Sequence, residues 1–284
     1  MALNFEDIAG HPALRASVQA QTHALLRAYE ASPRASSVFA TQQRWLMAHA
    51  GLALHFRRDS GDYRRELTAA RFVDAILQHS VASRNTAHAF VKEMQHYRFI
   101  EDAPGGGDGR IRPLQPSAVA LAELTGWILI HLGTLDSLDG SDRLATFLAQ
   151  PQMLADLQPL VADGLLSSAP VREPERTFSL FTWLDNGGIV MDWLISGVDP
   201  READQARIST GVVSIVDFAS WLKLSRTHLA RKLREAEALG SVGWLGRRDH
   251  SVTWISQEFY GEYVTAQAVK LAIIDATCAA RLAN

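Results

Sequence analysis

Apolar residues recur at three- and four-residue steps along most of the chain, which predicts a mainly helical protein. In the first third, this pattern predicts helices at 13–30, 36–56 and 65–80 and a fourth helix that begins after Ser83. A very apolar helix is predicted at 117–135, where Ser117 can cap its first turn.

The period changes in two places, at 98–117 and at 241–256. Each segment contains two short stretches on either side of a glycine-containing turn, the pattern of a β-hairpin. Helices are predicted again at 178–196, 212–222, after Ser225 and at 257–276, with an interruption of the first at Gly187-Gly188. The segment 138–176 predicts short helices and connectors, with 167–175 as a linker.

The order helix, helix, Ser-Arg helix, hairpin, long helix therefore occurs twice, 142 residues apart. The core positions of one copy, Ala87, Val91, Met94 and Ile100, correspond to Leu229, Leu233, Ala236 and Val242 of the other. Such a repeat determines the architecture. It divides the chain into an N-terminal unit at 1–137, a helical connector at 138–176 and a C-terminal unit at 177–284.

A helix pair followed by a hairpin is the plan of a winged helix-turn-helix unit. The stretch 218–242 resembles the winged-helix transcription regulators, and the long terminal helices resemble those of the MarR family. The matching residues are Ala219, Leu224, Ser225, Leu229, Leu233, Gly240 and Val242. In the first copy, Arg98 stands where a glycine is expected before the wing. The resemblance implies a mainly α fold with small β-hairpin wings, built from tandem winged helix-turn-helix units arranged as a pseudo-dimer.

The resemblance and the residue types together predict sequence-specific binding of double-stranded DNA by a bacterial-type transcriptional regulator. The first turns of a recognition helix need polar, donating side chains at base edges. The candidate residues of the first unit are Ser83, Arg84, Asn85, Thr86, His88 and Lys92, with Arg110 and Arg112 in its wing. Those of the second unit are Ser225, Arg226, Thr227, His228, Arg231 and Lys232, with Arg247 and Arg248 in its wing.

Charge supports this hypothesis only locally. The net charge of the 284 residues is −3, but segments 57–112 and 216–250 have balances of +2 and +3, and segment 135–204 has −8. We expect the more basic second unit to dominate DNA affinity. Alternatively, Glu235 and Glu237 neutralise the basic side chains of their helix, and the unit is a protein-interaction module without DNA binding.

The sequence indicates neither an enzyme nor a cofactor. The glycine-rich 105–109 lacks the Lys-Ser or Lys-Thr of a phosphate loop, and the Glu93/His96 pair has no counterpart in the second copy. The single cysteine, Cys278, is expected to be a small buried residue, and it fits a reducing, cytoplasmic compartment. The most apolar run, 126–135, is too short to span a bilayer, so no membrane is expected.

Two further partners are considered. MarR-like proteins often hold small aromatic ligands between their helical and DNA-binding parts, so the resemblance implies a small aromatic effector. Trp183, Trp193 and Trp221 are candidates for its site, although core packing is the favoured role for them. A homodimer is also compatible with the sequence.

Overall fold

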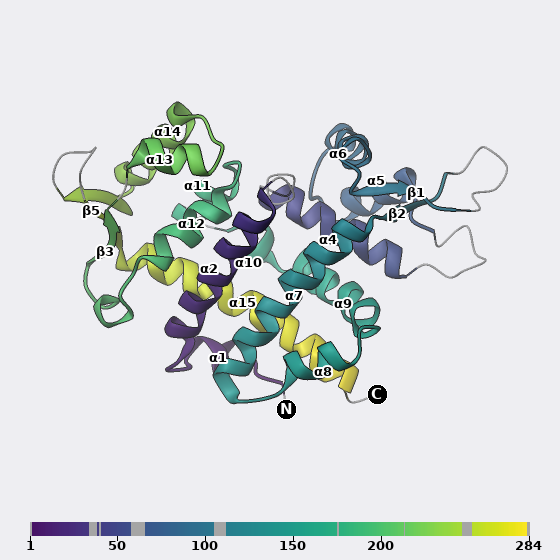
Figure 1. Cartoon of the computed structure of the whole chain (residues 1–284), viewed down its shortest axis with the longest axis horizontal. Coiled ribbons are helices and arrows are strands. Elements are labelled where there is room, and N and C mark those ends of the chain that lie inside the picture. Colours follow the sequence, from purple (N-terminus) through teal and green to yellow (C-terminus); the bar gives the residue numbers. More distant parts are fainter. Residues whose placement is uncertain are drawn as a thin grey trace.

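The protein is mainly helical and has two small antiparallel sheets, as the sequence predicts. The computed structural model describes residues 2–33, 39, 41–57, 66–104, 112–174, 176–212, 214–245 and 252–282. In Figure 1 the two sheets lie at opposite ends of the molecule, and the longest helices cross between them. Both termini lie at the lower edge of this view.

The first half contains most of the predicted helices and one two-stranded sheet. Its elements are α1 (Phe5–Ala9), α2 (Leu14–Ala31), α4 (Gln42–Phe56), α5 (Ala69–Gln78), α6 (Arg84–His96), β1 (Ile100–Asp102), β2 (Leu114–Pro116) and α7 (Ala118–Asp139). Strands β1 and β2 are antiparallel, with Ile100 opposite Pro116. The hairpin prediction for 98–117 is therefore confirmed.

The second half begins with helices that pack against the first half and ends with a three-stranded sheet and a long helix. Its elements are α8 (Arg143–Ala149), α9 (Met153–Ser167), α10 (Ala169–Arg172), α11 (Arg176–Thr182), α12 (Gly187–Ser196), η2 (Pro200–Glu202), β3 (Arg207–Val212), α13 (Ile215–Trp221), α14 (Arg226–Ala238), β4 (Val242–Leu245), β5 (Val252–Ser256) and α15 (Gln257–Leu282). The sheet order is β3-β5-β4.

Helix starts agree with the caps in the sequence at several points. The side chains of Ser83 and Ser117 accept hydrogen bonds from the backbone N–H groups of Thr86 and Ala120, at the starts of α6 and α7. Ser225 occupies the same cap position before α14 without such a bond. The predicted break is also present, since α11 ends at Thr182 and α12 begins at Gly187. Glycine is needed there, because a Cβ on Gly187 would lie 1.8 Å from the carbonyl oxygen of Phe181.

The helix predicted at 212–222 begins later than expected, and a strand was missed. Residues 207–212 form β3, which pairs with β5, and α13 starts only after the cap residue Ser214. The first unit has a shorter equivalent, because the N–H of Leu114 in β2 donates to the carbonyl of Leu67. These contacts join residues far apart in the sequence, so local periodicity does not reveal them.

The segment predicted as connector and linker is part of the core. Helix α9 is as long as α4, against which it packs, and it also contacts α15. The 167–175 linker includes the helical turn α10, in which Val171 is buried. The hydrophobic core is continuous across both halves. The boundaries at 137 and 176 therefore remain a prediction about the repeat and do not mark a gap in the core.

Two central helices connect the halves. Helix α15 contacts α1, α2, α7, α9 and α11 through the apolar stripe that the sequence predicts, in which Tyr263, Leu271 and Ile274 are buried. Cys278 is buried in the same helix. Burial, and to a smaller extent the charge of the nearby Asp275, raises the pKa of its thiol to about 11.

Helix α7 is longer than the 126–135 run on which the membrane argument was based. Among the described helices, it is the one whose length and apolar composition would allow it to cross a membrane. It packs against α2, α8 and α15 instead, with Ile128, Leu132 and Leu135 fully buried.

One turn of each predicted repeat copy makes the same backbone hydrogen bond. The N–H groups of Phe99 and Ser241, 142 residues apart, donate to the carbonyls of Met94 and Ala236 at 2.8 and 3.0 Å. The residue before each of them is left-handed, with φ of 58° at Arg98 and 72° at Gly240. Arg98 therefore adopts the left-handed backbone conformation that usually favours glycine, as Gly240 does at the matching position.

Arg98 provides a test of this equivalence. A left-handed non-glycine residue costs about 1 kcal/mol, so Arg98→Gly should stabilise the protein by up to about that amount. Gly240→Ala should destabilise it by a similar amount, and urea denaturation measures both changes. Destabilisation by Arg98→Gly would show that the strain is already offset by contacts of the arginine side chain.

Candidate nucleic-acid interface and central cavity

Helix α6 presents the predicted polar side chains to solvent and its apolar face to the core. Ala87, Phe90, Val91 and Met94 are buried, whereas Ser83, Arg84, Asn85, Thr86, His88 and Lys92 are exposed. Arg44 of α4 fixes the helix, because its guanidinium forms two hydrogen bonds, of 3.0 and 2.7 Å, with the carboxylate of Glu93. The charge of Glu93 is therefore compensated by Arg44.

Helix α14 has the same arrangement. Leu229, Leu233 and Ala236 are buried, and Ser225, Arg226, Thr227 and Arg231 are exposed, with His228 half-buried. The amide of Asn186 donates to the carbonyl of Leu222 at 3.1 Å, which ties the preceding helix α13 to the body of the protein.

The neutralising role considered for Glu235 is present. Its carboxylate lies 2.8 Å from the ammonium of Lys232 and 3.3 Å from the guanidinium of Arg231. The Lys232 side chain is only 15% exposed, so it is a weaker candidate for DNA contact than the sequence suggested. Within the described residues, Arg84 and Lys92 of α6 make no ion pair. The charge advantage expected for the second unit is therefore reduced.

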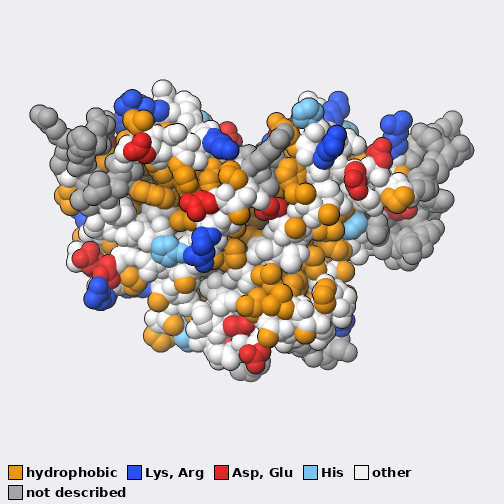
Figure 2. Space-filling view, in the orientation of Figure 1, with side chains coloured by type: hydrophobic (Ala, Val, Ile, Leu, Met, Phe, Trp, Pro, Cys, Tyr) orange, Lys and Arg blue, Asp and Glu red, His pale blue; other side chains and the backbone are white. Residues whose placement is uncertain are grey.

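Both helices lie along the same edge of the molecule. In Figure 1, α14 and α6 stand at the two ends of the upper edge, and the sheets flank them. Figure 2 shows basic side chains over each helix, as two separate groups on this edge. Each helix follows a left-handed turn, with φ of 54° at Ser80 and 55° at Lys223. The two helices thus lie on one edge of the molecule, each after the same kind of turn.

The wing residues are only partly described. Arg112 is exposed two residues before the start of β2. Arg110, Arg247 and Arg248 lie outside the described residues. Two exposed basic residues escaped the sequence analysis: Lys223, in the turn before α14, and Arg207 on β3, whose guanidinium lies 4.6 Å from the ring centre of Trp254. Lys223 stands directly before Leu224, one of the residues that match the helix-turn-helix pattern, and this position in the sequence could have identified it as a candidate.

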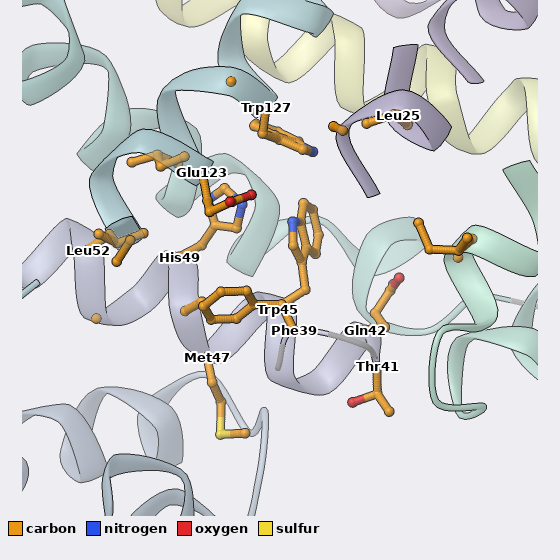
Figure 3. Close-up of a pocket in the computed structure, with 18 of the residues that line it drawn as sticks. Leu25, Phe39, Thr41, Gln42, Trp45, Met47, His49, Leu52, Glu123 and Trp127 are labelled. Atoms are coloured by element: carbon orange, nitrogen blue, oxygen red, sulfur yellow. The ribbon is translucent and has the colours of Figure 1, made fainter. Parts of the chain in front are cut away.

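A cavity of about 510 Å³ is lined by residues from both halves of the chain. Its lining includes Trp45 and His49 of α4, Trp127 and Glu123 of α7, and Phe39, as Figure 3 shows. The ring centres of Trp45 and Trp127 are 5.7 Å apart. Helices α2, α12 and α15 complete the wall, as does the buried face of α6 through Phe90 and Met94.

Three titratable groups from α12 and α15 border this cavity. Burial lowers the pKa of Lys270 to about 8, which the charge of Asp192 partly offsets. Burial raises the pKa of Asp192 to about 6, against the hydrogen bond that it accepts from the Tyr263 hydroxyl. The pKa of Tyr263 is raised well above its ordinary value by burial and by Asp192. In the sequence, Lys270 falls in the apolar stripe that contains Tyr263, Gln267 and Ile274, and a charged residue in such a stripe was the signal for this site.

Two buried histidines lie close by. Burial lowers the pKa of His49 and of His131 to about 3, and the charge of Lys270 acts in the same direction. The amide of Gln158 donates to Nδ1 of His49, and Nδ1 of His131 donates to the carbonyl of Trp127. Both rings are therefore neutral at pH 7.

The tryptophans singled out in the sequence do not line this cavity. Trp193 and Trp221 pack on Phe218, with ring centres 4.3 and 6.1 Å away, as expected for packing residues. Trp183 is 63% exposed, so the packing role expected for it is wrong. The cavity instead uses Trp45 and Trp127, which belong to the first half.

Comparison of the chain with protein-family models, curated proteins and solved structures found no significant match. The arguments about function that follow therefore start from the site geometry.

Proposed function

We propose that the protein binds double-stranded DNA sequence-specifically, as a cytoplasmic transcriptional regulator with two winged helix-turn-helix units arranged as a pseudo-dimer. The observation that supports this most is the shared edge of α6 and α14. Each helix follows a second helix and a left-handed turn, and each exposes donor side chains in its first turns. This is the surface that a recognition helix presents to the major groove.

The residue types suit base and phosphate contacts. Arg84 and Arg226 have the planar donors that pair with guanine, and the Asn85 amide can pair with adenine. Lys92 and Arg231, further along the helices, suit phosphates. Two units in one chain would contact half-sites about one helical turn apart, roughly 34 Å. A homodimer is compatible with this arrangement but is not needed for it, and the cavity offers space for a small effector.

A protein-interaction role is the second candidate. Leu239 and Leu245, at the end of α14 and in β4, are 59% and 56% exposed, which is unusual for large apolar side chains beside a DNA-binding helix. Glu235 also reduces the positive charge of α14. Both features suit a protein surface better than a polyanion.

Titration of the protein against a labelled pool of random duplexes distinguishes the two candidates. We expect binding at low salt that weakens steeply as the salt concentration rises, because each phosphate contact releases counterions. Sequencing of the retained duplexes should give two half-sites with centres about 10 base pairs apart. Absent binding at low salt, or binding without salt dependence, would contradict DNA binding and leave a protein partner as the function.

A further inference from the structure

We propose that the central cavity binds a small molecule with an apolar body and one carboxylate, and that the ammonium of Lys270 pairs with that carboxylate. The proposal goes beyond DNA binding and does not depend on it, because its test contains no DNA.

The size and lining of the cavity suit an apolar body. A volume of about 510 Å³ is within the range of small-molecule sites in proteins. Trp45, Trp127 and Phe39 supply flat apolar walls on one side, and Ile189 and Met191 of α12 lie in the lining from the other half of the chain. A ligand here would replace water along mostly apolar surface, which favours binding.

Lys270 provides the charged end of the site. Its side chain is partly buried in the cavity wall, and this burial lowers the pKa of the ammonium to about 8. The ammonium lies 6.0 Å from the ring centre of Trp45, and within the described residues it has neither a hydrogen bond nor an ion pair. A partly buried charge without a direct partner costs free energy, which the charge of Asp192 offsets only in part, and a ligand carboxylate in contact with the ammonium would offset more of it.

The two carboxylates of the wall do not fill this role. Asp192 accepts a hydrogen bond from Tyr263 and makes no ion pair with Lys270. Glu123 of α7 also lines the cavity, with the same intermediate exposure as Lys270, and makes no ion pair with it. Neither carboxylate pairs directly with Lys270, so its ammonium is open to a ligand carboxylate, and the expected ligand is an acid rather than an amine.

Titrations followed by tryptophan fluorescence test the proposal, since Trp45 and Trp127 line the cavity. The probes are decanoate and 2-naphthoate, compared with decanol, 2-naphthol and decylamine. We expect at least one of the two acids to bind about tenfold or more tightly than its alcohol. The acid that binds better identifies the body as an alkyl chain or an aromatic ring.

Variants locate the carboxylate. Lys270→Met should remove the tenfold preference for the acid while leaving the affinity for the alcohol unchanged, and Lys270→Arg should retain the preference. Lys223→Met, an exposed lysine in the turn before α14, is the matched control and should change neither affinity. Thermal melting of each variant checks that it is folded.

Three results would overturn the proposal. The first is the absence of binding by both acids up to their solubility limits. The second is an alcohol or the amine binding as tightly as the acids. The third is a preference for the acid that survives in folded Lys270→Met.

Discussion

Replacing Arg84 and Lys92 with alanine should lower the affinity for the selected DNA by about 30-fold or more. One base contact by arginine contributes about 1–3 kcal/mol, and one phosphate contact adds about one unit to the salt slope. Arg226→Ala with Arg231→Ala should cost no more than the first pair, because Arg231 already interacts with Glu235. Fluorescence anisotropy at several salt concentrations measures both affinity and slope.

The variant that carries all four alanine substitutions should lose specific DNA binding. Arg201→Ala is a suitable control, since this arginine is highly exposed, interacts with Asp199 and lies on η2 rather than on either candidate helix. If both pairs leave affinity unchanged in folded protein, neither helix faces DNA. If only the second pair matters, the two units are unequal in the way that local charge alone suggested.

Glu235→Gln should have the opposite effect on DNA affinity to the alanine pairs. It frees Arg231 and Lys232 from their shared carboxylate, so DNA affinity should rise by about threefold to tenfold. Glu202→Gln removes the same charge away from both helices and should have little effect. A fall in affinity with Glu235→Gln would mean that the ion pairs position the basic side chains productively.

Acid should destabilise the fold well before ordinary carboxylates are protonated. His49 and His131 have folded pKa values of about 3, below the ordinary 6.5, so the unfolded chain binds more protons between these values. Their stabilising effect is complete above pH 6.5 and is lost as the pH falls. Asp192 opposes them between its ordinary 3.8 and its folded value of about 6. The net excess of about one proton gives a loss of about 1.4 kcal/mol per pH unit between pH 6 and 4.

Urea denaturation between pH 7 and 4.5 measures this slope. His131→Leu should bring it near zero, because one histidine and Asp192 then cancel, and Asp192→Asn should roughly double it. His88→Gln changes an exposed histidine of α6 and serves as the control. Unchanged slopes in the first two variants would mean that these groups do not determine the acid sensitivity.

Local sequence was sufficient for most of the helices. Serine caps, apolar spacing and glycine breaks act within a few residues, so Ser83, Ser117 and Gly187 predicted helix ends correctly. The paired core positions on the two helices, such as Val91 with Leu233, are buried because helical periodicity determines which side faces inward, whereas Ile100 on β1 is only partly buried.

The tertiary structure decided the features that depend on distant partners. Strand β3 exists because it pairs with β5, and α9 joins the core because α4 and α15 cover it. The conformation of Arg98 follows from the turn that it occupies rather than from its own preference. Periodicity does not encode these contacts, since each requires the chain to return to the same place.

Charge and chemistry show the same division. The sequence by itself determined most of the side chains that α6 and α14 expose, because exposure follows from helical spacing, although His228 and Lys232 are partly buried. Only the tertiary structure decided that Glu93 interacts with Arg44, that Lys270 faces a cavity, and that α6 and α14 lie on one edge. The physical reason is that electrostatic interactions and burial depend on neighbours in three dimensions. These neighbours can be more than 200 residues apart in the sequence, as Trp45 and Lys270 are.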